Sequence, residues 1–291
     1  MRQKLSFDES KTMKPTALAN ITLMHTEIYR SLKQWLRGLQ QMVKRSRNIP
    51  DRLWRQTLAR YPFLTNRPDA DVAKLRVLAG QFLAQKQFSG AHGLVVTDEM
   101  AVAIAAQACL PVLNLGLQLY NDFKGIVVHP GAMLARRSMV DDAGVHHVYK
   151  ESLVGEAMQG GPITLSWQDV AASSEHAARG YNVVIHEFAH KLDMHSSAGG
   201  IPNGCPPLPN RTAKAQWQTT MQAAYGAFKV QVVMAERFGA PAPWLDAYGA
   251  TSPAEFFAVA TEAYFANPHQ FKTDFAQVNV LFDAYFGEKR A

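Results

Sequence analysis

Apolar residues recur at helical spacing in the first part of the chain. Residues 21–47 place apolar side chains on one face and basic side chains on the other, which predicts an amphipathic helix. Asn48-Ile49-Pro50 ends it, and a second amphipathic stretch covers residues 51–61. Residues 1–20 have no periodicity and predict a mobile arm.

From residue 62 onward, short apolar runs alternate with helical patterns. The predicted helices are 69–88, 97–109, 182–194 and 252–265, and the predicted strands are 94–96, 125–129 and 161–167. Residues 196–210 are rich in glycine and proline and predict a loop. Pro162 at the start of the last strand predicts an edge position, because proline cannot donate to the ladder. We therefore expect an α+β domain over residues 62–291, mostly helical, with residues 21–61 as an N-terminal helical extension.

Composition supports a folded domain without a membrane anchor. The chain has 291 residues, of which 47% are hydrophobic and 19% charged, so it can bury a core. Cys109 and Cys205 are its two cysteines, which excludes a disulfide scaffold. The N-terminus lacks the apolar segment of a secretory signal, and the longest apolar stretch, 100–119, is interrupted by polar residues and proline. We expect a soluble, cytoplasmic protein with no membrane span.

The positive charge is local. Residues 30–60 hold nine lysines and arginines against one acidic residue, Asp51, whereas the formal net charge of the whole chain is +6. One interpretation is contact with nucleic acid or an anionic membrane; the other is a helix docked on the core with a solvated basic face. Trp35 and Trp54 favour docking, and no nucleic-acid motif accompanies the charge. We expect no nucleic-acid partner.

The segment His186-Glu187-Phe188-Ala189-His190 carries the strongest chemical signal. Histidines four apart on a helix share one face and can bind one ion, and neutral imidazole suits Zn²⁺. Glu187 could act as general base on a metal-bound water. Residues 183–185 are apolar and predict a buried helix, in which these polar groups without a metal would be costly. The alternative is a pair of exposed histidines beside a glutamate.

A catalytic zinc ion needs a third protein ligand and an open position. His195 lies one residue short of the place where metzincins have their third histidine. Glu255 and Glu262 are better candidates, because they are seven apart and share one side of the predicted helix 252–265. Glu255 could instead complete a capping box with Ser252. Spacing alone leaves the choice between the two glutamates open.

The order of these residues resembles a known family. The segment His186–Asp193, followed by Tyr248 and Glu255, is similar to the Mlc titration factor A family of bacterial zinc peptidases, which resemble the catalytic domain of anthrax lethal factor. The likeness extends over residues 62–287 and includes 109–116, 161–167 and 253–259. It implies a zincin-like metallopeptidase core with a small mixed sheet.

The resemblance also assigns roles to residues. It implies one Zn²⁺ per chain, held by His186, His190 and Glu255. Glu187 would be the catalytic acid and base, and Tyr248 would stabilise the oxyanion of a tetrahedral intermediate.

Two further carboxylates have roles that stay open. Glu262 could orient a zinc-bound histidine from the second coordination shell. Asp193 could do the same or cap its helix. For both residues a purely structural role remains the alternative.

Two functions remain open. The resemblance implies aminopeptidase activity on small synthetic amides, and we expect strand 163–167 to pair with an extended peptide substrate. It also implies binding to the Mlc repressor, a DNA-binding regulator of glucose phosphotransferase genes. The chain would then be a zinc-dependent peptidase, or a protein that sequesters the repressor while its proteolysis is incidental.

Overall fold

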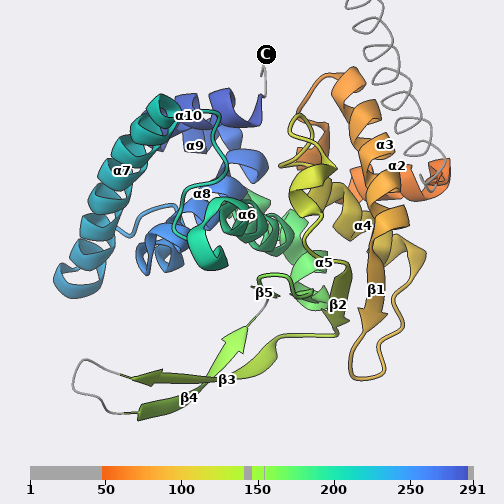
Figure 1. Ribbon diagram of the computed structural model, residues 1–291, viewed down its shortest axis with the longest axis horizontal. Helices are drawn as coiled ribbons and strands as arrows, with labels where there is room; N and C mark the ends of the chain where they lie inside the picture. Colours follow the sequence, from red (N-terminus) through yellow and green to blue (C-terminus); the bar gives the residue numbers. More distant parts are fainter. Residues whose placement is uncertain (1–47, 141–145, 154, 288–291) are drawn as a thin grey trace, which may run out of the picture. The chain divides into compact units, whose positions relative to one another are not determined.

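The computed structural model describes residues 48–140, 146–153 and 155–287 (Figure 1). The predicted arm at 1–20 and the predicted helix at 21–47 lie outside the described residues. All described residues belong to one compact unit that begins at Ser46. The fold is α+β and mostly helical, as the sequence predicts.

A small mixed sheet forms one layer of this unit. Its strand order is β1-β2-β6-β5. Strands β1 (Gln87–Gly90), β2 (Gly125–His129) and β6 (Ile163–Ser166) run parallel, and β5 (Gly155–Ala157) is antiparallel to β6. Strands β3 (Met133–Val140) and β4 (His146–Leu153) form a separate antiparallel pair.

Two predictions about strands and one about the end of a helix are wrong. The strand predicted at 161–167 is β6, which lies inside the sheet between β2 and β5. Pro162 precedes its first paired residue, so the missing N–H removes no ladder bond. Residues 94–96 form no strand, and Val95 is 79% exposed. The helix predicted at 69–88 ends at Gln85, and its last residues belong to β1.

Helices cover the sheet and build the rest of the domain. They are α2 (Asp51–Arg60), α3 (Asp69–Gln85), α4 (Asp98–Cys109), α5 (Trp167–His176), α6 (Val183–Ser196), α7 (Arg211–Phe238), α8 (Pro253–Ala266), α9 (Pro268–Asp274) and α10 (Ala276–Phe286). Side chains of Thr97, Asn182 and Ser252 cap α4, α6 and α8, as expected at the predicted helix starts. The sequence pattern does not predict helix α7, because few of its residues face the core. The buried ones are Trp217, Met221, Phe228 and Val232. Among the described helices, none has the length and apolar character needed to span a bilayer.

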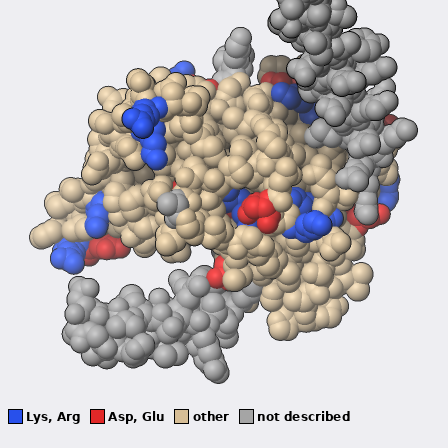
Figure 2. All heavy atoms as spheres, in the orientation of Figure 1, with Lys and Arg blue, Asp and Glu red and all other residues tan. Residues whose placement is uncertain are grey.

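Helix α2 belongs to the core of this unit. Leu53 and Trp54 are buried, and α2 packs against α4. This helix therefore shares one core with residues that follow position 62, where the domain is predicted to begin. Arg52 on its outer side pairs with Glu99 at 3.7 Å. Among the residues coloured in Figure 2, charged side chains lie in small separate groups, some of one sign and some of both. These contacts agree with a docked helix for the described part of the basic segment.

Helix α6 lies at the centre of the packing that positions the candidate site (Figure 1). It contacts α4 and α8 as well as strands β5 and β6. Phe188 anchors it, with its ring 4.9 Å from that of Tyr120 and 5.6 Å from that of Phe82. Because the helix is buried along most of its length, its polar side chains must find partners inside the protein.

Candidate metal centre

The start of α6 is fixed by Asn182. Its side-chain oxygen accepts from the backbone N–H of Ile185 at 2.9 Å, and its amide nitrogen donates to Gln107 Oε1 in α4 at 2.8 Å. The backbone N–H of Asn182 donates to Glu262 in α8. This one residue therefore sets the position of α6 relative to both neighbouring helices.

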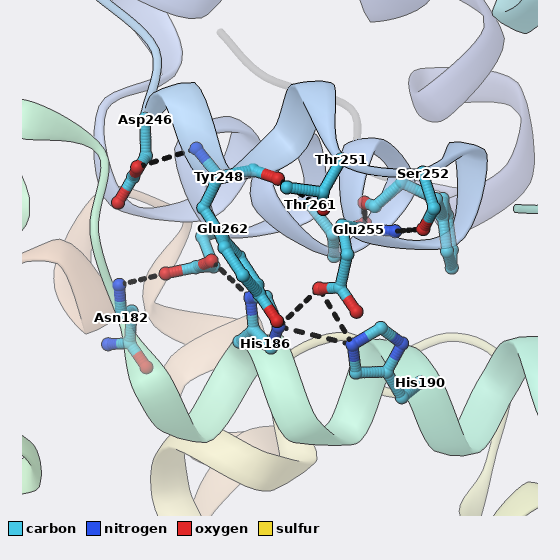
Figure 3. Close-up of polar contacts among 11 residues, drawn as sticks. Asn182, His186, His190, Asp246, Tyr248, Thr251, Ser252, Glu255, Thr261 and Glu262 are labelled. Atoms are coloured by element: carbon cyan, nitrogen blue, oxygen red, sulfur yellow. Dashed lines mark hydrogen bonds and ion pairs between the residues drawn. The ribbon is translucent and has the colours of Figure 1, made fainter. Parts of the chain in front are cut away.

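Three side chains from α6 and α8 meet at one point (Figure 3). His186 Nε2 lies 3.1 Å from His190 Nε2 and 3.1 Å from Glu255 Oε2. His190 Nε2 lies 3.3 Å from the same Glu255 oxygen. The structure thus brings together the two histidines that share a helix face and a carboxylate 65 residues beyond His190.

Glu262 contacts the other nitrogen of His186. Its Oε1 lies 2.6 Å from His186 Nδ1, and the side chain is buried. A carboxylate at Nδ1 favours the neutral tautomer that carries its proton there, and in that tautomer the Nε2 lone pair faces His190 and Glu255. Of the two glutamates that spacing could not separate, Glu255 contacts His186 at Nε2 and Glu262 contacts it at Nδ1.

The side chain of Glu255 takes no part in capping α8. Ser252 Oγ accepts from the backbone N–H of Glu255 at 3.1 Å, which is half of a capping box. The Glu255 carboxylate does not complete the box but points to His186 and His190 (Figure 3). Capping uses the main chain of this residue and leaves its side chain available.

Burial and opposite charges act on every ionisable group of the cluster. Burial lowers the pKa of His186, but the nearby carboxylates of Glu262 and Glu255 outweigh it and raise that pKa well above its usual value. Burial raises the pKa of Glu187 and that of Glu262. Burial also acts to raise the pKa of Glu255, but hydrogen bonds to His186 and His190 lower it strongly. Carboxylates held so close to two imidazoles form an environment that attracts a cation.

The donor set fits a metal ion. Bonds of about 2.0–2.1 Å to a tetrahedral ion place donor atoms roughly 3.4 Å apart, close to the 3.1–3.3 Å separations found here. In its neutral form with the proton on Nδ1, His186 offers the Nε2 lone pair, and a cation at this point would accept lone pairs from both imidazoles and from Glu255. His190 Nδ1 is buried and has no hydrogen-bond partner among the described residues, so the polar contacts of this imidazole are made through Nε2, which faces His186 and Glu255.

Glu187 is buried beside the cluster and faces the sheet. A Cβ atom at Gly155 in β5 would lie 2.4 Å from Glu187 Oε1, so the carboxylate lies directly against the backbone of the edge strand. It makes no contact with Glu255 comparable to those of the histidines. Glu187 is therefore separate from the three facing donor atoms, although it lies on the same helix as His186 and His190.

Tyr248 lies on the exposed side of the cluster. Asp246 Oδ1 accepts from its backbone N–H at 2.9 Å, and Thr251 Oγ1 donates to its carbonyl at 2.7 Å, which fixes the short helix η5 (Ala247–Ala250). Its ring centroid is 6.1 Å from that of His186, and Figure 3 shows the side chain extending toward this histidine. The residue is 44% exposed.

Two other candidates lie away from the cluster. Asp193 accepts from the backbone N–H groups of Gly204 at 2.6 Å and Cys205 at 3.1 Å, so it organises the loop after α6 and does not orient a histidine. His195 is exposed and is absent from the group of metal-binding candidates among the described residues. The structure therefore supports the structural alternative for Asp193.

Sequence reasoning missed Asn182, Gly155 and Lys191. Lys191 follows His190 directly and is fully buried, although lysine on a helix is usually solvated. Gly155 has no side chain, and Asn182 was predicted only as a helix start. No residue-type pattern marks any of them, because their partners are backbone groups or residues far away in the sequence.

Comparison with known proteins agrees with this arrangement. Residues 30–287 match the family model described as glucose-regulated metallo-peptidase M90. The chain is 36% identical over 233 residues to a protein of Serratia proteamaculans named Mlc titration factor A, covering 80% of this chain and 86% of the relative. Proteins of the same name from Salmonella arizonae and Klebsiella pneumoniae are each 36% identical; the matches cover 77% and 76% of this chain, and 86% and 80% of those relatives.

Proposed function

Because this chain belongs to the glucose-regulated metallo-peptidase M90 family, we propose that it is a zinc-dependent peptidase with aminopeptidase-like activity. His186, His190 and Glu255 would hold one Zn²⁺ per chain. The observation that carries the proposal is the convergence of three donor atoms, 3.1–3.3 Å apart, from two different helices. The zincin-like fold and the buried support from Glu262 agree with it.

Each side chain around the cluster then has a chemical task. A bound zinc ion would supply Lewis-acid activation of a water molecule and of the scissile carbonyl. Glu187 takes the proton of the attacking water and delivers it to the leaving amine, a role suited to a buried carboxylate whose pKa is raised. Tyr248 donates a hydrogen bond to the oxygen on which negative charge grows.

The substrate is proposed to pair with β5 rather than with strand 163–167. Both edges of β6 are occupied by neighbouring strands, whereas β5 is the last strand of its sheet. An extended peptide can add to such an edge through main-chain hydrogen bonds. Because Glu187 lies against Gly155, a peptide on β5 would pass beside the general base.

Metal analysis of the purified protein tests the proposal directly. We expect one zinc ion per chain in the wild type and its loss in His186→Ala. Hydrolysis of small peptide amides should stop when a chelator removes the metal and return when zinc is added. Metal-free protein that hydrolyses these amides at the wild-type rate would refute the metal-dependent mechanism.

The names of the relatives favour a second candidate function. Each is called a titration factor for Mlc, so this chain is proposed to bind an Mlc-type repressor in the cytoplasm. The two cysteines of the chain are free and buried, which agrees with a reducing compartment. A Glu187→Gln protein that still relieves repression in cells would favour sequestration, and one that fails while still binding zinc would favour proteolysis.

A further inference from the structure

Helix α6 carries a second pair of polar residues four positions apart. Glu187 and Lys191 lie one turn from each other, as His186 and His190 do, but on a neighbouring face. The histidines face α8, whereas Glu187 and Lys191 contact β5 and the turn that joins it to β6. This second pair has no place in the ligand cluster.

The Lys191 ammonium is fully enclosed and has three oxygen partners. Its Nζ donates to Asp122 Oδ2 at 3.2 Å, to the carbonyl of Gly161 at 3.2 Å and to the carbonyl of Met158 at 2.5 Å. Three acceptors match the three N–H donors of an ammonium group. Met158 and Gly161 flank the β5–β6 turn, whose own closing bond joins Gly161 N–H to Met158 O at 3.2 Å.

The same turn is held from its other side. With its amide placed to satisfy both groups, Gln159 donates to the carbonyl of Gly199 at 2.7 Å and accepts from the N–H of Gly200 at 3.2 Å. Gly200 has φ +67°, and a Cβ there would overlap the Gln159 side chain. The turn is therefore packed between α6 and the loop that follows α6.

Burial of a charged lysine requires an explanation, because an apolar side chain of similar size would avoid the desolvation cost. Here the ammonium links the helix that carries Glu187 to a turn whose residues 158–160 are exposed. The consequence is a fixed distance between α6 and strand β5. Glu187 depends on that distance, since its carboxylate already lies against the Gly155 backbone.

We propose that Lys191 is a positioning residue: it clamps the β5–β6 turn to α6 and so holds the edge strand and the Glu187 carboxylate in register beside the donor cluster. The inference rests on the proposed function for what β5 binds. The clamp itself is a property of the fold and can be measured without any substrate.

Lys86 offers a matched control. It is also a buried lysine that donates to two backbone carbonyls, those of Tyr120 and Phe123, the latter at 2.7 Å. Both lysines contact the same aromatic ring: Nζ of Lys86 lies 3.8 Å from the Phe123 centroid, and Nζ of Lys191 lies 4.6 Å from it. Lys86 has no hydrogen bond to the β5–β6 turn among the described residues.

The experiment compares Lys191→Met with Lys86→Met in the zinc-loaded full chain. Hydrogen–deuterium exchange of the amides of residues 155–161 should accelerate at least tenfold in Lys191→Met and stay unchanged in Lys86→Met. Both variants should retain one zinc ion per chain. With a peptide amide, Lys191→Met should raise KM more than it lowers kcat, because the strand that pairs with substrate is loosened.

Gly155→Ala tests the same geometry if Lys191→Met fails to fold. The added methyl group should displace Glu187, lower kcat and leave zinc content unchanged. Equal exchange at residues 155–161 in both lysine variants would overturn the clamp, and Gly155→Ala with wild-type kcat would overturn the placement of Glu187 against β5. If the wild type hydrolyses no peptide, the exchange comparison still decides the clamp, so its failure is distinct from that of the proposed function.

Discussion

The two polar faces of α6 are built in different ways. On the α8 side, His186 and His190 meet the carboxylates of Glu255 and Glu262, so side chains contact side chains. On the sheet side, Glu187 and Lys191 meet a glycine, two backbone carbonyls and one carboxylate. The first face is defined by residue types, and the second mainly by the path of the main chain.

This difference indicates that the two faces of α6 have different functions. Imidazole nitrogens that buried carboxylates orient suit metal binding, which needs specific donor atoms. Contacts to backbone groups instead fix the position of a strand whatever its side chains are. We therefore expect changes on the α8 side to alter metal affinity, and changes on the sheet side to alter turnover or substrate binding while metal remains bound.

Glu187→Gln should separate the effects on turnover from those on metal binding most clearly. The amide has nearly the same shape but cannot accept the proton, so kcat should fall by about a hundredfold to ten-thousandfold. Zinc content should match the wild type, because Glu187 lies outside the donor cluster. Steady-state kinetics and metal analysis on one preparation measure both; retained activity would remove the general-base role.

Tyr248→Phe should give the next largest effect. Loss of one hydrogen-bond donor to the developing oxyanion should lower kcat by roughly tenfold to a hundredfold, less than for an enclosed donor because the residue is 44% exposed. KM and zinc affinity should change little. If the variant instead loses metal, Tyr248 supports the α8-side cluster and does not act on the substrate.

The two faces also differ in how far the sequence predicts them. The spacing of His186 and His190 predicts one helix face, and capping residues predict where α6 and α8 begin. Residue types could not choose between Glu255 and Glu262, since both share one side of α8; the choice depends on which nitrogen of His186 each carboxylate reaches. The position of β6 inside the sheet and the role of Lys191 depend on long-range pairing, which local patterns do not encode.

Substitution of two buried carboxylates, Glu262 and Asp193, tests whether the α8 side of α6 controls metal affinity. Glu262→Gln weakens support at His186 Nδ1 and should reduce zinc affinity by about tenfold to a hundredfold. Asp193→Asn is the matched control, because Asp193 is equally buried on α6 but accepts only from loop groups. Competition with a chelator of known affinity measures both. Equal losses in the two variants would mean that general destabilisation, not ligand orientation, sets the affinity.

The smallest expected effect is a dependence of stability on pH that comes from Lys86, the buried lysine between α3 and β1. Burial lowers the pKa of Lys86 to about 8 from 10.5. Between these values the unfolded chain binds more protons at this site than the folded chain does, so the free energy of unfolding rises with pH, by at most about 1.4 kcal/mol per pH unit. Below pH 8 both states are protonated and the slope vanishes. Lys86→Met lacks the group, so the difference in unfolding free energy between wild type and variant should depend on pH only within this window. Urea titrations at several pH values measure that difference. A constant difference would show that the lysine stays charged in the folded protein, with its two carbonyl partners and the Phe123 ring compensating its burial.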